Sequence, residues 1–201
     1  MKKDFSEVFK IFKKHYQRIP LEIFHNNAYK TLISTLLSSR TKDEVTLEAS
    51  KRLFKKAPDI GKLQQLNLQT IEQLIYPVGF YKTKAKHLRR LARVVIKKYK
   101  GKIPKTRDCL TQLSGVGRKT ANLVLNHAFR IPAIAVDTHV HRISNILGWV
   151  STKTPETTEK ELEKILRKKY WTDINRLFVS IGRQYTTKNK LENFLKKEKV
   201  I

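Results

Sequence analysis

Hydrophobic residues recur along most of this chain at spacings of three and four positions, which is the period of an amphipathic helix. Near the start, the segment FSEVFKIF follows this spacing, so we predict a helix that begins at Phe5 and ends before Pro20. The same pattern predicts further helices over residues 28–38, from 40 onward, 60–76, 88–99, 106–113, 118–129, from 138 onward, 154–170 and 171–185. No alternation of apolar and polar residues is long enough to predict a strand. We therefore expect an all-α fold.

The net charge of the chain indicates which class of partner it binds. The 201 residues include 43 Lys and Arg against 17 Asp and Glu, which gives a net charge of +26. Such an excess predicts binding to a polyanion, with nucleic acid as the first choice and an anionic membrane surface as the second. No stretch approaches the ~20 apolar residues of a membrane span, and the first residues lack the apolar core of a signal peptide. We expect an intracellular protein without a membrane anchor.

One part of the chain concentrates this charge. Residues 82–107 contain twelve Lys and Arg residues and no Asp or Glu. Leu88 and Leu91 keep a helical apolar face through the run, so the charge occupies the other side of an ordered helix. Such a run can be only a solvated face, but the lack of any compensating acid favours a surface that follows a DNA backbone. We expect Lys82 and Lys84 to belong to this surface.

The most informative segment reads LTQLSGVGRKTANLVLNHAFRIPAIAVDTHVHRIS. Its pattern predicts a short helix over 106–113, a tight turn over 114–117 and a second helix over 118–129, which together form a helix-hairpin-helix. Gly115 and Gly117 are free to adopt positive φ, because glycine lacks the Cβ that disfavours it. Such a turn can direct backbone N–H groups at a phosphate, although an ordinary turn between helices fits the glycines equally well.

Two cations directly after the turn, Arg118 and Lys119, favour phosphate as its occupant. We therefore predict that the DNA backbone is bound by the turn and by the first residue of the second helix. These residues are Gly115, Val116, Gly117 and Arg118.

Chain geometry allows Lys119 and Asp137 to lie close together. The helix from Lys119 to Phe129 climbs roughly 15 Å at about 1.5 Å per residue, and residues 130–136 can span up to roughly 23 Å at about 3.3 Å per residue. A lysine in a first helical turn is usually a solvated charge, and an aspartate before a helix is usually an N-cap. The helix dipole, however, disfavours the protonated lysine, and only a neutral amine attacks carbon. Lys119 is therefore also a candidate nucleophile.

The segment that contains the hairpin, Lys119 and Asp137 resembles a known protein family. LSGVGRKTANLVLNHAF followed by IPAIAVDTHVHRISN is similar to the helix-hairpin-helix and Gly/Pro-Asp motif of the DNA glycosylase superfamily, and within it to the endonuclease III branch. Hairpin, lysine, helix and aspartate match in one register. The resemblance implies that Lys119 is the nucleophile and Asp137 the activating carboxylate. It also implies a monovalent cation at the hairpin, although Ser114 stands where the family has proline.

A second segment, LLSSRTKD, is similar to the family's LLS-x-Q-x-x-D, whose glutamine enters the space left by an extruded nucleotide. Arg40 stands in place of that glutamine, and it can either hydrogen-bond to an orphaned base or bind a phosphate from a loop. Phe80 matches an apolar wedge in the base stack, with packing between helices as an equal alternative. The family's pocket positions are matched by Ser38, Asp43 and His139, for each of which an ordinary structural role is equally open.

The cysteine content departs from the family. Cys109 is the only cysteine, whereas many endonuclease III relatives hold an iron–sulfur cluster with four cysteines near the C-terminus. We therefore expect no cofactor and no metal site, apart from the cation at the hairpin. The basic tail, residues 188–199, is our candidate for part of the rigidity and DNA contact that the cluster loop supplies in relatives.

The resemblance further implies two helical domains with a catalytic cleft between them. These are residues 21–131, with the hairpin at about 106–129, and residues 1–20 plus 132–201. It implies a monomeric base-excision-repair DNA glycosylase with abasic-site (AP) lyase activity, which acts on damaged bases or abasic sites in duplex DNA, oxidised pyrimidines such as thymine glycol first. Two alternatives stay open: a lyase that acts mainly on pre-formed abasic sites, and a non-catalytic DNA-binding module. The expected location is the cytoplasm of a prokaryote, at the nucleoid, or otherwise the cell interior.

Overall fold

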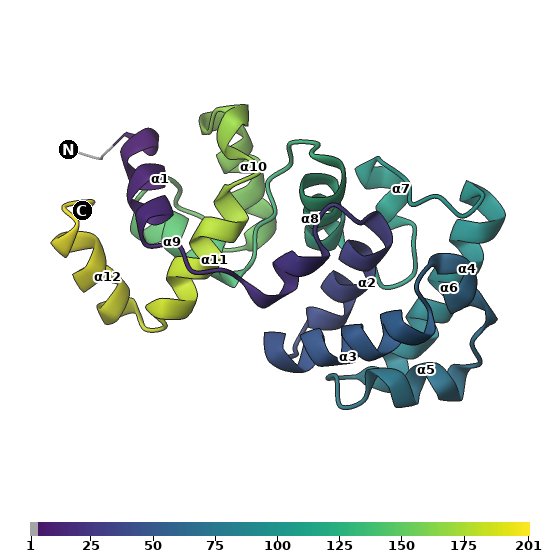
Figure 1. The fold of residues 1–201 in the computed structure, drawn as a ribbon. Coiled ribbons are helices and arrows are strands. Elements are labelled where there is room, and N and C mark those ends of the chain that lie inside the picture. The colour runs from purple at the N-terminus through teal and green to yellow at the C-terminus, as the bar shows by residue number, and fades with distance from the viewer. Residues whose placement is uncertain (1–3) are drawn as a thin grey trace. The chain divides into compact units, whose positions relative to one another are not determined.

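The computed structural model describes residues 4–201, and over this range the chain forms α-helices and two 3-10 helices without a strand (Figure 1). The predicted all-α fold is confirmed. In chain order the helices are α1 (Phe5–Lys14), η1 (Pro20–Phe24), α2 (Ala28–Ser38), α3 (Asp43–Lys56), α4 (Ile60–Gln65), α5 (Leu68–Ile75), α6 (Tyr81–Tyr99), α7 (Arg107–Thr111), α8 (Arg118–Phe129), α9 (Thr138–Ile146), α10 (Pro155–Ile165), η2 (Lys168–Tyr170), α11 (Ile174–Gln184) and α12 (Lys188–Lys197).

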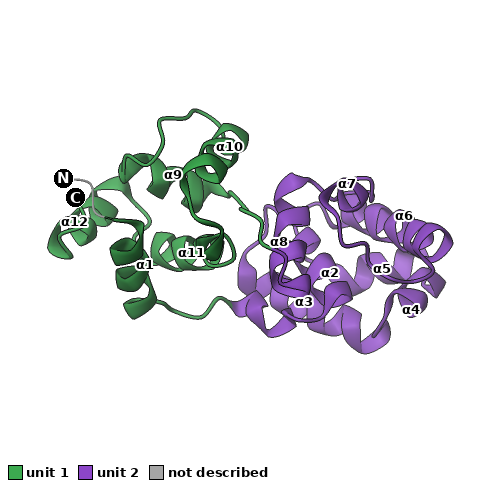
Figure 2. Cartoon of the chain, turned by 90° about the horizontal axis from the view of Figure 1, so that it is seen from above, with its two compact units in different colours: residues 1–19, 132–201 green, residues 20–131 purple. Residues whose placement is uncertain are grey.

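The chain divides into two compact units (Figure 2). Unit 1 combines the two ends of the chain, residues up to Ile19 and Pro132–Ile201, and it contains α1 and α9 to α12. Unit 2 is the continuous middle, Pro20–Ile131, and contains α2 to α8. Each unit buries its own set of apolar side chains.

Unit 2 is organised around α2, whose sequence AYKTLISTLLS buries residues on almost every side. A helix that is apolar all round is stable only when other elements surround it, and α2 packs on α3, α6 and α8. Asn27 caps it, with the side chain accepting a hydrogen bond from Lys30 N at 2.9 Å. The central helix therefore positions both α8, which follows the glycine turn, and α6, which carries the basic run.

Unit 1 has an aromatic core built from both ends of the chain. Phe9 and Phe12 of α1 pack on Phe178 of α11. Their ring centroids lie 6.1 and 5.1 Å, respectively, from the centroid of Phe178. From α12, Phe194 stacks on Tyr185 at 4.3 Å and lies 6.4 Å from Phe12. The tail that the sequence marks only as basic is thus a helix whose apolar face closes this core.

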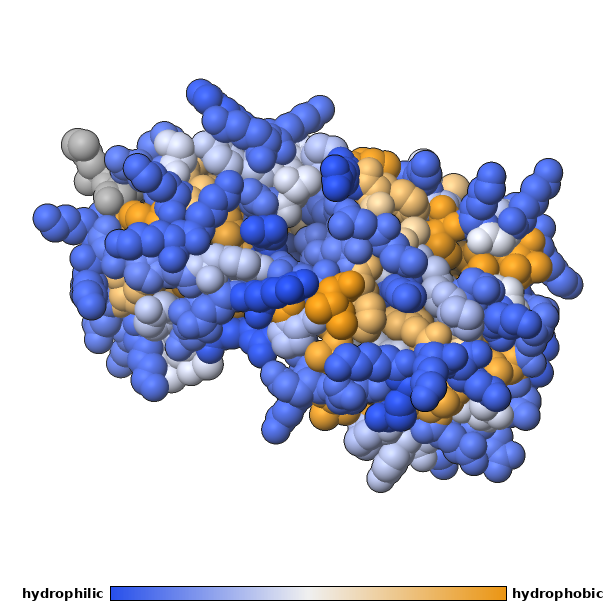
Figure 3. All heavy atoms as spheres, in the orientation of Figure 1, coloured by the Kyte–Doolittle hydropathy of each residue, from blue (hydrophilic) through white to orange (hydrophobic). Residues whose placement is uncertain are grey.

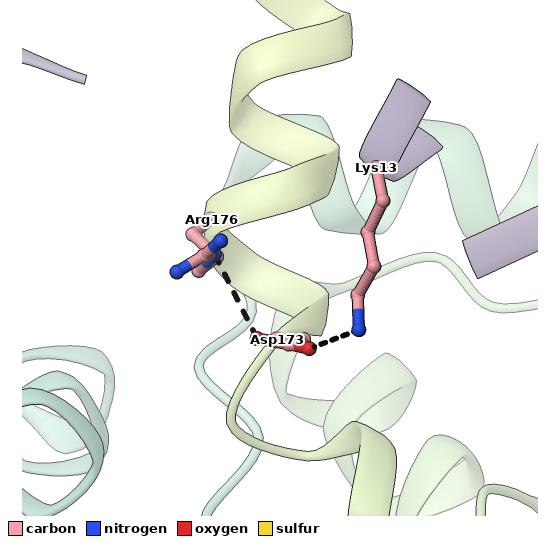
Figure 4. A network of polar contacts seen from close by, with 3 residues as sticks. All are labelled: Lys13, Asp173 and Arg176. Carbon is pink, nitrogen blue, oxygen red and sulfur yellow. Dashed lines mark ion pairs between the residues drawn. The ribbon is translucent and has the colours of Figure 1, made fainter. Parts of the chain in front are cut away.

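A small ion-pair network at the surface of unit 1 joins α1 to the start of α11 (Figure 4). Lys13 Nζ lies 3.0 Å from Asp173 Oδ2, and Arg176 Nε lies 3.7 Å from Asp173 Oδ1. All three side chains are partly exposed, and a pair of this kind contributes about 0–1 kcal/mol. The aromatic contacts therefore hold α1 in place more than the ion pairs do.

The predicted helices at the C-terminal side have different bounds. The helix predicted over 154–170 ends at Ile165, because Leu166 has an extended backbone, and the separate 3-10 helix η2 follows it. The helix predicted over 171–185 begins later, at Ile174. Helical periodicity continues through this connection, so apolar spacing alone does not mark the break.

Hydrophilic residues cover most of the face shown in Figure 3, and hydrophobic residues gather there in a few patches. None of the helices between residues 4 and 201 combines the length and the apolar character that crossing a membrane requires. The basic run forms one side of α6, where the exposed cations include Lys82, Lys86, Arg90, Arg93 and Lys97. The opposite side of α6 is buried.

Candidate functional site

The predicted helix-hairpin-helix is present as α7, a turn and α8. Within the turn, Val116 N donates a hydrogen bond to Leu113 O at 3.0 Å. The side chain of Val116 is 6% exposed, whereas Gly115 and Gly117 on either side are exposed. The valine therefore anchors the turn in unit 2 and leaves the flanking glycine backbone accessible.

The two glycines of this turn differ in conformation. Gly115 has φ 82°, and a Cβ there would lie 2.9 Å from His87 Cγ and 3.2 Å from Leu36 Cδ1, so both backbone and space require glycine. Gly117 has φ −90° and ψ 176°, and a Cβ there would meet nothing within 4 Å. Gly115 uses the freedom to adopt positive φ, whereas Gly117 does not, and its backbone conformation suits any residue.

Lys119 occupies an exposed position in the first turn of α8. The N-cap of this helix is Gly117, which has no side chain to accept a hydrogen bond from the first backbone N–H groups. Those groups carry partial positive charge. The start of α8 therefore favours an anion beside Arg118 and Lys119.

Asp137 belongs to unit 1 and is the N-cap of α9. It follows an extended segment, residues 133–136, that is almost fully buried. Its Oδ1 accepts hydrogen bonds from His139 N and Val140 N, both at 2.9 Å. The predicted capping role is confirmed, and these two bonds hold the carboxylate in a fixed orientation. Its proximity to Lys119 and its part in chemistry stay predictions.

Arg40 and Phe80 form a pair in unit 2. The Arg40 guanidinium carbon lies 5.5 Å from the centroid of the Phe80 ring. Phe80 is 61% exposed, so the alternative in which it packs between helices is wrong. Both residues have left-handed backbone, with φ 52° for Arg40 and 57° for Phe80. This conformation excludes Arg40 from a helix, and α3 begins at Asp43 and not at Arg40 as predicted. Such strain in a residue with a Cβ is concentrated at functional sites in proteins.

An open pocket of about 240 Å³ lies beside this pair. It is lined by Leu36, Ser39, Arg40, Phe80, Thr83, Lys84, His87 and Gly115. His87 Nδ1 lies 2.8 Å from Ser114 Oγ, a contact that ties α6 to the hairpin turn. His87 is not among the predicted site residues, because a single histidine on a basic helix gives no signal of a partner 27 positions away.

Ser38, Asp43 and His139, which match the family's pocket positions, do not line this pocket. Ser38 Oγ donates a hydrogen bond to Thr35 O at 2.9 Å at the end of α2, and Asp43 lies in the first turn of α3. His139 belongs to unit 1 and packs closely on Gly182, where an added Cβ would lie 2.2 Å from its Nδ1. Their roles in a base pocket stay predictions.

The two lysines at the start of α6 are placed differently. Lys82 is exposed, as a phosphate contact requires. Lys84 is 5% exposed, and its amine donates hydrogen bonds to Leu37 O at 2.8 Å and Ser39 O at 2.6 Å. Burial lowers the pKa of Lys84 to about 8. The structure therefore turns this amine towards its own chain, and a direct phosphate contact by Lys84 does not fit its position.

Metal ligands are scarce in the part of the chain that the structure describes. No group of three or more His, Cys, Asp or Glu side chains in residues 4–201 is placed to hold a metal ion. Cys109 is a partly exposed free thiol near the start of α7.

Comparison with known proteins places these features in a family. The model of the HhH-GPD superfamily base excision DNA repair proteins matches residues 33–168. Endonuclease III of Thermotoga maritima is 45% identical over 168 residues, which cover 84% of this chain and 79% of that protein. Endonuclease III-like protein 1 of Gallus gallus is 43% identical over 159 residues, which cover 78% of this chain but only 57% of that protein.

A solved structure agrees with these sequence matches. A trapped endonuclease III–DNA covalent intermediate, in an estranged-adenine complex, superposes with a TM-score of 0.82 and 37% identity, and the match covers 90% of this chain and 84% of that chain. The family match includes both Lys119 and Asp137. The resemblance to endonuclease III is thereby confirmed, and the chain belongs to the HhH-GPD superfamily of base excision DNA repair proteins.

Proposed function

We propose that this protein is a DNA glycosylase with AP lyase activity that removes damaged pyrimidines from duplex DNA. The observation that carries the proposal is the position of Lys119, exposed in the first turn of α8 and directly after a turn with accessible backbone. A phosphate bound at that turn brings a sugar within reach of the amine. The relatives named endonuclease III, and the covalent endonuclease III–DNA intermediate among the similar structures, support this reading.

Binding to the DNA backbone is the first step that we propose. Backbone N–H groups of the turn from Gly115 to Gly117, together with Arg118, hold one phosphate. A monovalent cation at the hairpin would be held by backbone carbonyls of the turn and would add positive charge near that phosphate. The exposed cations of α6, Lys82 among them, follow the neighbouring phosphates. Such contacts give affinity without sequence preference and weaken as salt concentration rises.

Extrusion of the damaged nucleotide is the second step, because no side chain reaches a glycosidic carbon inside stacked duplex. We assign it to the pair of Arg40 and Phe80. The exposed phenyl ring acts as a wedge in the base stack, and the neighbouring guanidinium fills the gap and hydrogen-bonds to the orphaned base.

Chemistry at Lys119 is the third step. Its neutral amine attacks C1′ of the sugar, and the bond from C1′ to the base breaks with its electron pair going to the base, which leaves after taking up a proton. Asp137 either accepts a proton from the amine or stabilises positive charge on the sugar. Ring opening gives a Schiff base between Nζ and C1′. The electron-withdrawing iminium acidifies the C2′ proton, whose loss expels the 3′ phosphate and cleaves the strand.

Oxidised pyrimidines such as thymine glycol are the substrates that we propose first, on the resemblance to endonuclease III. We further propose that units 1 and 2 are the two domains of the family fold, that the protein acts as a monomer, and that it acts on cellular DNA, in a prokaryote at the nucleoid. Ser38, Asp43 and His139 are proposed as residues near the base, in accordance with their positions in the family motif.

We also propose that the protein works without an iron–sulfur cluster. Such clusters need several thiolate ligands, and Cys109 is the only cysteine of the 201 residues. The residues present therefore do not fit a cluster, and no step above uses one. We assign the structural part of its role to α12, whose Phe194 packs among the aromatic rings of unit 1.

Base release and strand cleavage on two matched duplexes test the proposed function. One duplex contains thymine glycol and the other a pre-formed abasic site, and Lys119→Ala is the comparison variant. Release of thymine glycol followed by strand cleavage, with both lost in Lys119→Ala, is the expected result. Cleavage of the abasic duplex alone would instead leave a lyase. Tight, salt-sensitive binding with neither reaction would contradict the enzyme and leave a DNA-binding module.

A further inference from the structure

Two segments of unit 2 present the pair of Arg40 and Phe80. The first, which we call the Arg40 loop, comprises residues 39–42 between α2 and α3. The second, which we call the Phe80 turn, comprises residues 76–80 between α5 and α6. Residues 43–75 separate the two segments in sequence, so local structure alone does not bring them together.

The amine of Lys84 lies at the junction of these segments. From the first turn of α6, directly after the Phe80 turn, its Nζ donates hydrogen bonds to Leu37 O at 2.8 Å and Ser39 O at 2.6 Å, and it lies 3.3 Å from Thr41 Oγ1. Leu37 O belongs to the last turn of α2, where carbonyl oxygen atoms lack intrahelical partners, and Ser39 O belongs to the Arg40 loop. One amine thus joins the start of α6 to both the end of α2 and the Arg40 loop.

Thr41 and Gly79 complete the junction. Gly79 N donates a hydrogen bond to the same Thr41 Oγ1 at 3.1 Å. A Cβ on Gly79 would lie 2.5 Å from Arg40 O, which leaves no room for any other residue. The Phe80 turn therefore lies directly against the backbone of the Arg40 loop.

A lysine buried to this degree needs an explanation, since lysine is almost never fully buried without a partner. Its partners here are two backbone carbonyls and one hydroxyl, and burial lowers its pKa from 10.5 to about 8. A leucine or methionine fills similar space without this cost. The two residues next to the junction, Arg40 and Phe80, both hold left-handed backbone, and strain of this kind persists only where surrounding contacts maintain it.

We infer that Lys84 is a positioning residue, which locks the Arg40 loop to the Phe80 turn so that the guanidinium and the phenyl ring enter the duplex as one rigid unit. This inference rests on the proposed function, because it assigns a purpose to the pair that the proposal makes responsible for extrusion. Lys84 itself does not contact DNA in this account. Its contribution is to the geometry of the wedge, where a displacement of about 1 Å can cost about 100-fold in rate.

The test uses the full chain and a duplex that cannot react, so it does not depend on catalysis. The duplex carries a tetrahydrofuran abasic analogue opposite 2-aminopurine, whose fluorescence rises when the base is unstacked. Lys84→Met removes the hydrogen-bond donors and keeps an apolar stem. Lys55→Met removes the same charge from an exposed position on α3 of the same unit, which has no part in the proposed DNA contacts, and serves as the matched control.

With wild type and Lys55→Met at saturating protein, we expect a large fluorescence increase. With Lys84→Met we expect affinity within about 3-fold of that of Lys55→Met, because contacts to the DNA backbone dominate binding, but less than half of the fluorescence increase. A full increase with Lys84→Met, or no increase with wild type, would overturn the inference.

Reaction rates separate this inference from the proposed function. A single-stranded oligonucleotide with an abasic site needs no wedge, so we expect Lys84→Met to cleave it within about 3-fold of the wild-type rate and to lose about 30-fold or more on the duplex. Equal losses on both substrates would overturn the positioning role. A wild type that binds and unstacks 2-aminopurine without cleaving either substrate would contradict the proposed lyase alone.

Thr41→Val provides a second test of the inference if Lys84→Met does not fold. It removes the hydroxyl shared by Lys84 and Gly79 at almost constant volume. We expect it to lower the fluorescence increase and the duplex rate in the same direction as Lys84→Met, with the single-strand rate unchanged. Wild-type values for both duplex measurements would overturn the inference.

Discussion

The clearest stability prediction concerns Phe194, which joins α12 to the rest of unit 1. Its side chain is 5% exposed, and its ring stacks on Tyr185 at 4.3 Å and meets His15 edge-on at 5.1 Å. Truncating a buried Phe to Ala costs about 3–5 kcal/mol, and each aromatic pair adds about 0.5–1.5 kcal/mol. Because neighbouring side chains relax into part of the cavity, we expect a value near the lower end of this range, about 3 kcal/mol, for Phe194→Ala.

Tryptophan fluorescence during urea unfolding measures this loss selectively. The chain has two tryptophans, and both, Trp149 and Trp171, pack on the core of unit 1. With an m-value of about 1.5 kcal/mol per M, a loss of about 3 kcal/mol lowers the midpoint by about 2 M urea. Asn193→Ala, on the exposed side of the same helix, should shift it by less than about 0.3 M. Equal midpoints for the two variants would refute the assignment of α12 to the core.

Three further predictions concern unit 2. Gly79→Ala places a Cβ 2.5 Å from Arg40 O, so we expect duplex cleavage to fall by about 10-fold or more, and an unchanged rate would contradict the close packing described here. Burial lowers the pKa of Lys84 from 10.5 to about 8, so the unfolded chain binds more protons than the folded chain between these pH values. The free energy of unfolding of wild type relative to that of Lys84→Met should therefore rise from pH 8 to 10, by up to about 1.4 kcal/mol per pH unit. Denaturant unfolding that shows a constant or falling difference would contradict this prediction. The logarithm of DNA affinity should fall linearly with the logarithm of salt concentration, and Lys82→Ala should reduce the slope by about 1; a slope that Lys82→Ala leaves unaltered argues against a phosphate contact.

Apolar periodicity and N-cap residues in the sequence predict the central helix of unit 2 and the helix that carries Lys119. Predicted helices over 28–38 and 118–129 have the bounds that the structure gives to α2 and α8. Both are apolar over much of their surface and begin after a residue suited to an N-cap, Asn27 and Gly117. Where such signals are weak, as at Leu166, the predicted helix continued through a break.

Contacts between distant segments could not be predicted in the same way. The pattern marks Lys84 as one cation in a basic run, yet its partners lie 43 to 47 positions earlier in the chain. Gly117 is a second example, since a glycine in a turn permits positive φ and the backbone at this position does not adopt it. The residue type limits the backbone conformations and contacts that are possible at a position. Contacts with residues distant in sequence determine which of them occurs.

The helical tail shows how composition can conceal packing. Lysine is the commonest residue in the segment 188–199, and the net positive charge favours a solvated segment. Leu191, Phe194 and Leu195 nevertheless share one buried side of α12, at the spacing of an amphipathic helix. Three apolar residues in a basic segment suffice to attach it to an aromatic core.

The central claim is that Lys119 forms a Schiff base with the sugar of a damaged nucleotide. Borohydride reduces such an intermediate to a stable amine, so a covalent protein–DNA complex records it directly. We predict trapping of wild type on both the thymine glycol and the abasic duplex, with mass spectrometry of the digested complex placing the adduct on Lys119 Nζ, and no trapping of Lys119→Ala under the same conditions. A wild type that binds both duplexes tightly yet forms no adduct, or an adduct on another residue, would contradict the account.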